Sequence, residues 1–548
     1  MTALLTDNLP LLAGALNGIK KLRELILELA VRGKLVEQDA SDEPASELLK
    51  RIAAEKKRLV AEGKIKKQKP LAVIAEEEKP FELPAGWEWT HLGELGLVGS
   101  SSRVHQKDWQ TSGVPFYRAR EIVRLSKDGF VENELFISEE LYQEFSAGGS
   151  APKVGDIMLT GVGTIGVPYR VQEVDRFYFK DASVLIFKKY VGDNSGYLLK
   201  YFVSPLWINT IHAESMGTTV HTLTIARANE TLCPLPPLAE QHRIATKVDE
   251  LMALCDRLEA QQADAASAHA QLVQALLGSL TQASAATEFA ANWQRLAEHF
   301  HTLFSTEPSI DALKQALLQL ALMGKLVTQD PSDEPASELL KHIDEARVSS
   351  VSGGRKRKQI DQPLIDDNEK DFELPNGWDW VRLQRIISVS SGDGLVSADM
   401  SPAGGVPVYG GNGVTGYHDK QNIEKETLVI GRVGYYCGSI HLTPTNAWIT
   451  DNALIVSFSE ENLYKSFLFW LLKGTNLKEQ ENATAQPVIS GRKIYSIVLA
   501  IPPLAEQHRI VAKVDQLMSL CDQLKTQLSQ ARQLNQQLAS TLVEQAVA

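Results

Sequence analysis

The chain has 548 residues, of which 44% are hydrophobic and 23% are charged, and its formal net charge is −12. These proportions are ordinary for a soluble globular protein, and the length predicts roughly three or four units that each bury a core. No apolar run approaches the about 20 residues of a membrane span, and residues 1–18 lack the features of a secretory signal peptide. We therefore expect a cytoplasmic protein without a membrane partner.

The N-terminal part of the chain occurs twice. The segment GKLVEQDASDEPASELLKRI from Gly33 to Ile52 returns as GKLVTQDPSDEPASELLKHI from Gly324 to Ile343. Further along the chain, FELPAGWEW from Phe81 returns as FELPNGWDW from Phe372. An internal repeat of this size predicts that a structural unit has been duplicated.

Each copy of this repeat predicts two helices. Ile19 to Arg32 carries apolar residues on one face, and Gly33 after it is a natural helix stop; the counterpart is residues 312–323. A second helix is expected from near Pro44 to about Glu62, and its counterpart starts near Pro335 and ends earlier.

Basic connectors that contain proline follow these helices. The residues concerned are Lys64, Lys66, Lys67 and Lys69 in the first copy, and Arg355, Lys356, Arg357 and Lys358 in the second. A solvated linker and a segment that contacts phosphates both fit this composition.

The middles of the two copies differ in sequence but share an order of elements. Trp87 to Leu232 alternates short β-rich runs with glycine turns and then has an apolar helical stretch, and Trp378 to Leu499 does the same. Shared order with different residues predicts two α+β domains of one fold with different surfaces.

A long helix is predicted after each middle. LPPLAEQHRIATKVDELMALCDRLEAQ from Leu235 to Gln261 returns as IPPLAEQHRIVAKVDQLMSLCDQLKTQ from Ile501 to Gln527. The proline pair suits a helix start, and the apolar residues that follow recur at steps of four and three, which is the period of a coiled-coil seam. Two such helices of about 40 residues, each about 60 Å long, could lie against one another as a rod. Gln262, His269 and Asn535 are polar seam positions that would set its register.

These patterns divide the chain into six segments. We predict an N-terminal helical segment (1–80), a first α+β domain (81–234), a first long helix (235–280), a central helical segment and linker that repeats the N-terminal segment (281–370), a second α+β domain (371–500) and a second long helix (501–548).

The sequence lacks the motifs of a catalytic or metal-binding protein. No Asn/Asp-Pro-Pro-aromatic loop of an amino-methyltransferase and no GxxxxGK[ST] phosphate loop occurs. The glycines at Gly161, Gly163 and Gly166 lie between predicted strands, where they do not form a dinucleotide site. The four cysteines form no CxxC pair, which favours buried thiols over zinc ligands. We therefore expect a binding protein without enzymatic activity.

The repeated PPLAEQHRI with its heptad tail, the repeated FELPxGWxW and the two dissimilar middles resemble the specificity subunit of a type I restriction–modification enzyme. The resemblance covers nearly the whole chain. It implies two target-recognition domains, each of which binds one half of a bipartite, asymmetric site in double-stranded DNA, separated by long antiparallel coiled-coil helices. The alternative is a two-domain coiled-coil scaffold that binds proteins.

The resemblance also implies the partners and their cofactors. Two modification subunits would bind S-adenosylmethionine, and two restriction subunits would hydrolyse ATP with Mg²⁺, so this chain itself would hold no cofactor and no metal. The charge is unusual for a DNA-binding protein: residues 87–232 carry 14 Lys and Arg against 17 Asp and Glu, and residues 378–499 carry 10 against 11. We expect partner subunits to neutralise the phosphates while these domains contact the bases.

Candidate DNA-binding residues are polar side chains on turns that can approach base edges in the major groove. They are Arg103, His105, Lys107, Arg118, Arg120, Thr160, Thr164, His221 and Thr222 in the first domain, and Tyr409, Asn412, Tyr417, His418, Arg432, Tyr435, Ser490 and Arg492 in the second. Candidate partner-binding residues are the seam positions Ile244, Val248, Leu251, Ile510, Val514 and Leu517.

Overall fold

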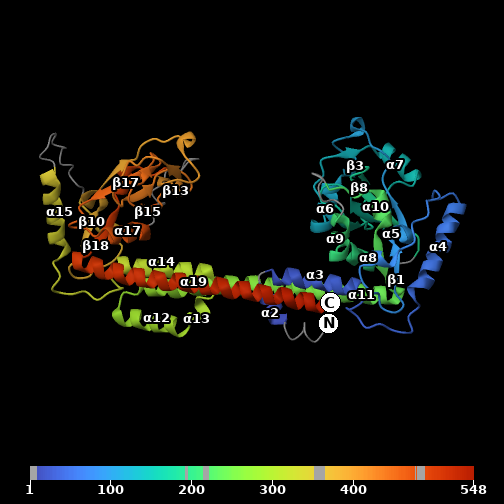
Figure 1. Ribbon diagram of the computed structural model, residues 1–548, viewed down its shortest axis with the longest axis horizontal. Coiled ribbons are helices and arrows are strands. Elements are labelled where there is room, and N and C mark those ends of the chain that lie inside the picture. The colour runs from blue at the N-terminus through green and yellow to red at the C-terminus, as the bar shows by residue number, and fades with distance from the viewer. Residues whose placement is uncertain are drawn as a thin grey trace. The chain divides into compact units, whose positions relative to one another are not determined.

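The computed structural model describes residues 9–15, 17–191, 195–213, 221–350, 364–475, 477 and 488–547. It divides into two compact units, of which unit 1 comprises residues 1–265 and 531–548 and unit 2 comprises residues 266–530 (Figure 1). The predicted basic connector at residues 355–358 lies outside the described residues. In the described part of the chain, no helix is long and apolar enough to cross a membrane.

Unit 1 begins with the helices α2 (Leu9–Gly14), α3 (Gly18–Val31) and α4 (Ala45–Ala61). The bounds of α3 and α4 confirm the two predicted helices. Gly33 ends α3 in the left-handed region, with φ +69°, and a Cβ at this position would lie 2.5 Å from Pro84 Cγ. This close approach explains why the GKL and LPxGW motifs are repeated together.

Unit 2 repeats this arrangement with α14 (Glu307–Leu322) and α15 (Ala336–Ser350). Gly324 also has φ +69°, and its Cβ would lie 2.5 Å from Pro375 Cγ. Helix α14 starts five residues before the predicted Ala312, because the Thr306 hydroxyl accepts a hydrogen bond from the backbone N–H of Ser309. Two further helices, α12 (Ala286–Glu298) and α13 (Phe300–Leu303), precede α14.

Domain 1, the part of unit 1 from Glu88 to Leu235, is built on a four-stranded sheet of order β2-β8-β5-β6 and a three-stranded sheet of order β4-β3-β7, and β1 and β9 pair at its base. Its elements, with the short helix η1 (Glu76–Glu78) before them, are β1 (Glu88–His91), α5 (Leu92–Leu95), β2 (Gly96–Gly99), η2 (Gln106–Asp108), β3 (Val114–Tyr117), α6 (Ala119–Asp128), β4 (Phe136–Ile137), α7 (Glu139–Ala147), β5 (Ile157–Thr160), β6 (Pro168–Arg170), β7 (Tyr178–Phe179), β8 (Val184–Lys189), α8 (Ser195–Phe202), α9 (Pro205–Ala213), α10 (Ile225–Glu230) and β9 (Leu232–Leu235).

Domain 2, from Asp379 to Ile501 in unit 2, has the same topology, with sheets β11-β17-β14-β15 and β13-β12-β16 and the pair β10–β18. Its elements, after η3 (Asp367–Glu369), are β10 (Asp379–Arg382), α16 (Leu383–Ile386), β11 (Ile387–Ser391), η4 (Ser397–Asp399), β12 (Val406–Gly410), β13 (Gly413–His418), β14 (Leu428–Gly431), β15 (Ile440–Leu442), β16 (Trp448–Ile449), β17 (Ala453–Phe458), α17 (Lys465–Gly474), α18 (Gly491–Tyr495) and β18 (Val498–Ile501). The two domains therefore share one fold, as predicted.

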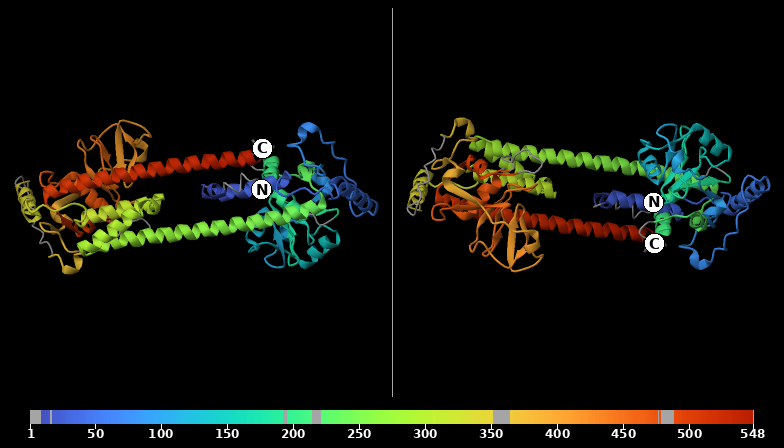
Figure 2. Two further views of the ribbon diagram at one scale, coloured as in Figure 1. Left: turned by 90° about the horizontal axis from the view of Figure 1, so that it is seen from below. Right: turned by 90° about the horizontal axis from the view of Figure 1, so that it is seen from above.

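The long helices are α11 (Leu238–Gln282) and α19 (Leu504–Val547), and each begins in one unit and ends in the other. In unit 1, α3 lies between them (Figure 2). Arg23 of α3 pairs with Asp256 and Glu259 of α11, while Lys21 of α3 donates a hydrogen bond to Ser540 of α19.

In unit 2, α14 takes the place that α3 has in unit 1. Lys314 pairs with Asp522, and Asp311 pairs with Lys525, so α14 runs antiparallel to α19. Just past the end of α14, the Lys325 ammonium donates to the carbonyl oxygens of Thr281 and Ala283 at the end of α11. The two long helices therefore run in opposite directions in this unit.

We expected the apolar seams of α11 and α19 to pack directly against one another. In the structure, the shorter helices α3 and α14 pack on these seams as well. Within each unit, most of the apolar seam side chains pack in clusters with α3 or α14. Gln262 donates to the Ala13 carbonyl and the His269 ring lies 3.2 Å from the Thr302 carbonyl, so these polar seam positions contact the short helices or the segments beside them. Leu272 and Leu538 continue the predicted apolar period farther along α11 and α19, yet they are 52% and 45% exposed.

Candidate nucleic-acid interface

A buried carboxylate ties the segment just before each domain to the long helix that follows the domain. Glu240, near the start of α11, accepts hydrogen bonds from Trp87 Nε1 at 3.0 Å and from Gln38 Nε2 at 3.2 Å. Burial raises the pKa of Glu240, and the two hydrogen bonds oppose this shift. Residues Glu506, Trp378 and Gln329 repeat the arrangement in unit 2. This contact explains why the LVxQD, GWxW and AEQHR motifs recur as a set.

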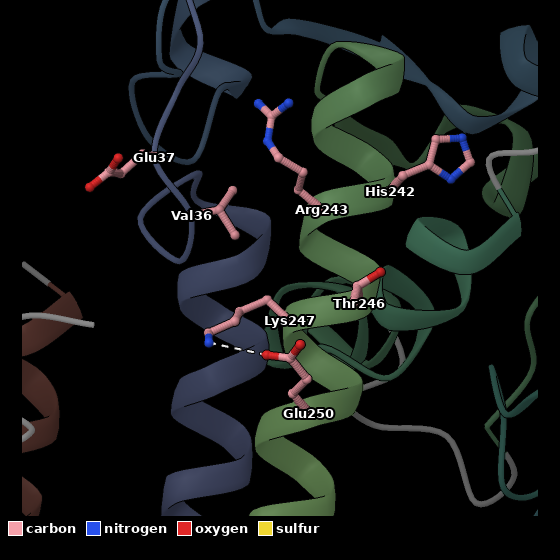
Figure 3. A pocket seen from close by; sticks show the side chains of 7 residues that line it. All are labelled: Val36, Glu37, His242, Arg243, Thr246, Lys247 and Glu250. Carbon is pink, nitrogen blue, oxygen red and sulfur yellow. Dashed lines mark hydrogen bonds and ion pairs between the residues drawn. The ribbon is translucent and has the colours of Figure 1, made fainter.

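Beside Glu240, the exposed face of α11 and the loop after α3 form an open hollow (Figure 3). It is lined by Val36, Glu37, His242, Arg243, Thr246, Lys247 and Glu250. Arg243 Nη2 lies 2.6 Å from Asp42 Oδ2, and Arg509 and Asp333 repeat this ion pair in unit 2. The described residues contain no group of three or more His, Cys, Asp or Glu side chains that could hold a metal ion.

In domain 1, the turn between β5 and β6 meets the segment before α10. Val162 and Thr222 form a β-bridge, and the backbone N–H of Gly163 donates to the His221 carbonyl at 3.2 Å. The structure thus brings Thr164, His221 and Thr222 together, as a DNA-contacting surface requires. Thr160 does not belong to this surface, because it is fully buried and its hydroxyl is used by Thr164 O and Val167 N inside the turn.

The other candidates of domain 1 lie on two further segments. Arg103, His105 and Lys107 are exposed on the loop that contains η2. Arg118 and Arg120 lie directly after β3, where Glu121 and Glu134 pair with them.

In domain 2, the turns β12–β13 and β14–β15 enclose a shallow hollow, which we call the tyrosine hollow. It is lined by Gly411, Asn412, Thr415, Val433, Gly434, Tyr435, Tyr436 and Asn452. The rings of Tyr435 and Tyr436 are 73% and 54% exposed and pack edge to face. Residue type and position selected Asn412 and Tyr435, whereas Thr415, Tyr436 and Asn452 were missed because the hollow joins three separate turns.

A second contact in domain 2 matches the one in domain 1. Val433 and Val488 form a β-bridge, and the backbone N–H of Ile489 donates to the Arg432 carbonyl at 2.9 Å. Arg432 is half-buried, while Ser490 and Arg492 lie at the start of α18, where Arg492 is exposed. Equivalent turns therefore carry candidate residues in both domains.

The three remaining candidates of domain 2 lie on β12 and β13. Tyr409 is only 8% exposed and packs in a core cluster with Ile449, so it offers little surface to DNA. The His418 ring packs against Trp448, and its Nδ1 lies 3.0 Å from the Asp399 carbonyl. Tyr417 next to it is half-buried.

The candidate partner-binding residues need correction. Ile244, Val248, Leu251, Ile510 and Val514 are buried in the chain's own core clusters, and Leu517 is partly buried in another. Their side chains pack within the chain, so they offer little surface to a partner. The exposed residues of the same repeated segment, such as those of the hollow beside Glu240, are the ones that a partner can reach.

Two domains of one fold, with different polar turns on a duplicated helical frame, are the architecture of a protein with two separate binding domains. The chain belongs to the family of the type I restriction modification DNA specificity domain, whose model matches residues 84–266 and 375–531. It is therefore a specificity subunit of a type I restriction–modification system, the component that recognises DNA sequence and not a catalytic one.

Two curated proteins are similar to this chain along nearly its whole length. The chain is 36% identical to the type I restriction enzyme EcoEI specificity subunit and 37% identical to the EcoAI specificity subunit, both from Escherichia coli, over 97% of this chain and 94% of each relative. A solved structure described as the structural basis underlying complex assembly and conformational transition of the type I R-M system matches with a TM-score of 0.49 at 19% identity, covering 85% of this chain and 99% of that one.

Proposed function

We propose that domain 1 and domain 2 each bind one half of a bipartite, asymmetric DNA site. The observation that carries this proposal is that equivalent turns of one shared fold present different side chains. In domain 1, Thr164 of the β5–β6 turn and Thr222 of the segment bridged to it stand where Tyr435 and Val488 stand in domain 2. Different hydrogen-bonding groups in the same place select different base pairs in the major groove.

The duplicated frame supports a complex with two copies of each partner. The hollow beside Glu240 contains His242, Arg243 and Lys247, and α19 repeats these residues as His508, Arg509 and Lys513. Two equivalent surfaces on one chain suit two copies of the same modification subunit. In this proposal, two restriction subunits join the complex as well, and the whole complex acts on DNA in the cytoplasm.

Catalysis belongs to the partner subunits in this proposal. The modification subunits bind S-adenosylmethionine and methylate the site, and the restriction subunits use ATP and Mg²⁺ to cleave DNA. They also supply the phosphate contacts that this chain, with its net charge of −12, does not provide by itself. Domains 1 and 2 then contribute mainly base contacts, which carry specificity.

The first prediction is that this chain alone decides where the host DNA is methylated. Deleting it from a host that keeps the partner subunits should abolish methylation at one bipartite motif with an unread spacer, and supplying it again should restore that motif. Long-read sequencing of methylated positions measures both results. If methylation stays unchanged, or if the chain pulls down only proteins and no DNA, it would instead be the two-domain scaffold.

A further inference from the structure

Two arginines of domain 1 share one buried carboxylate. Arg118 Nη2 and Nε donate to the two oxygens of Glu121 at 2.8 and 3.1 Å, and Arg120 Nε donates to Glu121 Oε1 at 2.5 Å. The Glu121 side chain is 3% exposed, whereas those of Arg118 and Arg120 are 25% and 51% exposed. Burial disfavours the charged form of Glu121, but the hydrogen bonds from both arginines outweigh it and lower its pKa, so this carboxylate is ionised at neutral pH.

The pair lies at a position where the two domains differ. In domain 1, β3 pairs with β7 in parallel through Tyr117 and Phe179, and in domain 2, β12 pairs with β16 in the same way through Tyr409 and Ile449. The residues that follow these strands are therefore equivalent. Domain 1 has arginines there, whereas domain 2 has the β12–β13 turn that lines the tyrosine hollow.

The hydrogen bonds to Glu121 use one edge of the Arg118 guanidinium, and Glu134 Oε2 lies 3.9 Å from Nη2, beyond hydrogen-bond distance. Glu121 occupies the edge formed by Nε and Nη2, so the edge formed by Nη1 and the second N–H of Nη2 remains. Two parallel N–H groups match the O6 and N7 acceptors of guanine in the major groove. A guanidinium that is already held in place loses less conformational entropy on binding than a free one.

We propose that Arg118 reads guanine in the half-site bound by domain 1, and that Glu121, which Arg120 also holds in place, is the positioning residue that aims it. This inference rests on the proposed function. Glu134, which is 75% exposed and lies 2.7 Å from Arg120 Nη2, gives way when DNA approaches, because an exposed ion pair contributes little to stability.

Glu121 also has a structural role at the start of α6. The substitution Glu121→Gln separates this role from the positioning role. Glu121 Oε2 accepts a hydrogen bond from the backbone N–H of Arg118 at 2.9 Å, which caps the start of α6. Glutamine keeps an oxygen for this cap, since Glu and Gln both serve at this position, but it lacks the charge that holds two guanidinium groups. Glu121→Gln therefore weakens the positioning and retains the helix start.

The experiment compares Arg118→Lys, Glu121→Gln and Arg176→Lys in the full chain with its partner subunits. Arg176 pairs with Glu139 elsewhere in domain 1 and serves as the matched control. Sequencing of methylated host DNA gives the motif, and selection of bound duplexes from a random library gives the preference without catalysis. Arg118→Lys should lower the preference for guanine at one position of one half-site by about five- to 150-fold, as expected for one bidentate arginine–guanine contact. Glu121→Gln should relax the same position by a smaller factor, and Arg176→Lys should change nothing.

A half-site of domain 1 without guanine, or an unchanged preference in Arg118→Lys or Glu121→Gln, overturns the inference while the bipartite motif still supports the proposed function. An equal relaxation by Arg176→Lys overturns it as well, since any lost arginine would then have the same effect. Absence of a bipartite motif with the unaltered chain means instead that the proposed function has failed.

Discussion

His441 on β15 supports the turns that carry the candidate residues of domain 2. Its Nε2 lies 3.0 Å from Ser439 Oγ, and this hydroxyl donates to the Gly411 carbonyl at 3.0 Å. Because the Ser439 hydroxyl is used as a donor, the ring must donate its Nε2–H to it. Burial lowers the pKa of His441, and the nearby Lys473 ammonium adds to this shift. The neutral ring therefore links the β14–β15 turn to the β12–β13 turn.

The second prediction is that the contribution of His441 to stability depends on pH. A histidine with a lowered pKa binds fewer protons in the folded than in the unfolded state, so its contribution is complete above the unfolded pKa of about 6.5 and declines as the pH falls below it. Acidification from about pH 7.5 to about pH 5.5 should destabilise the unaltered chain more than the His441→Gln variant. Urea unfolding of both proteins at the two pH values measures this difference, and equal losses in both would contradict it.

At the scale of elements, the helices could be predicted because their signals are local. The apolar faces and the glycine after each helix placed α3 and α4 within one residue of their bounds. The repeated order of β-rich runs predicted the shared fold of domains 1 and 2. The partner of a long-helix seam could not be predicted, because an apolar period shows that a face is covered but not by which helix. Both α3 and α14 carry apolar faces that can cover such a seam, and in the structure they do so.

For the candidate site too, the local features could be predicted and the contacts between distant segments could not. Residue type and position between strands selected Thr164, His221 and Thr222, which the structure places close together, and their contact with DNA stays a prediction. The burial of Thr160 and Tyr409 was not predicted, because short strands leave open which face of the sheet a residue occupies. Tyr436 and Asn452 were missed, since only the fold brings their turns together.

The long helices also allow a prediction about stability. Leu251 of α11 is 7% exposed in the core of unit 1, whereas Leu272 of the same helix is 52% exposed. Leu251→Asp should cost more than the about 2–5 kcal/mol of a core Leu→Ala change, because the carboxylate also loses its hydration. Leu272→Asp should change the free energy of unfolding by about 0.5 kcal/mol or less. Urea unfolding compares the two, and similar losses would show that the seam is covered at both positions.

At the scale of the whole molecule, the chain combines a duplicated frame with two domains that have diverged on their turns. The frame is held by the same contacts in both units, including the Trp87–Glu240 and Trp378–Glu506 hydrogen bonds. The domains keep one topology but place different side chains at equivalent positions. Under the proposed function, this combination keeps the assembly constant and leaves sequence recognition free to vary in each half independently.

The most direct test of this account alters the equivalent turns of the two domains one at a time. Thr164→Ala with Thr222→Ala changes the β5–β6 turn of domain 1 and the segment bridged to it, and Arg432→Ala with Tyr435→Ala changes the equivalent β14–β15 turn of domain 2. Each double variant, assembled with its partner subunits, is expressed in the host, and the methylated positions are sequenced. The account predicts that each variant relaxes one half of the motif, a different half for each, and leaves the other half and the spacer unchanged. Relaxation of the same half by both variants, or of both halves by either one, would contradict the assignment of one half-site to each domain.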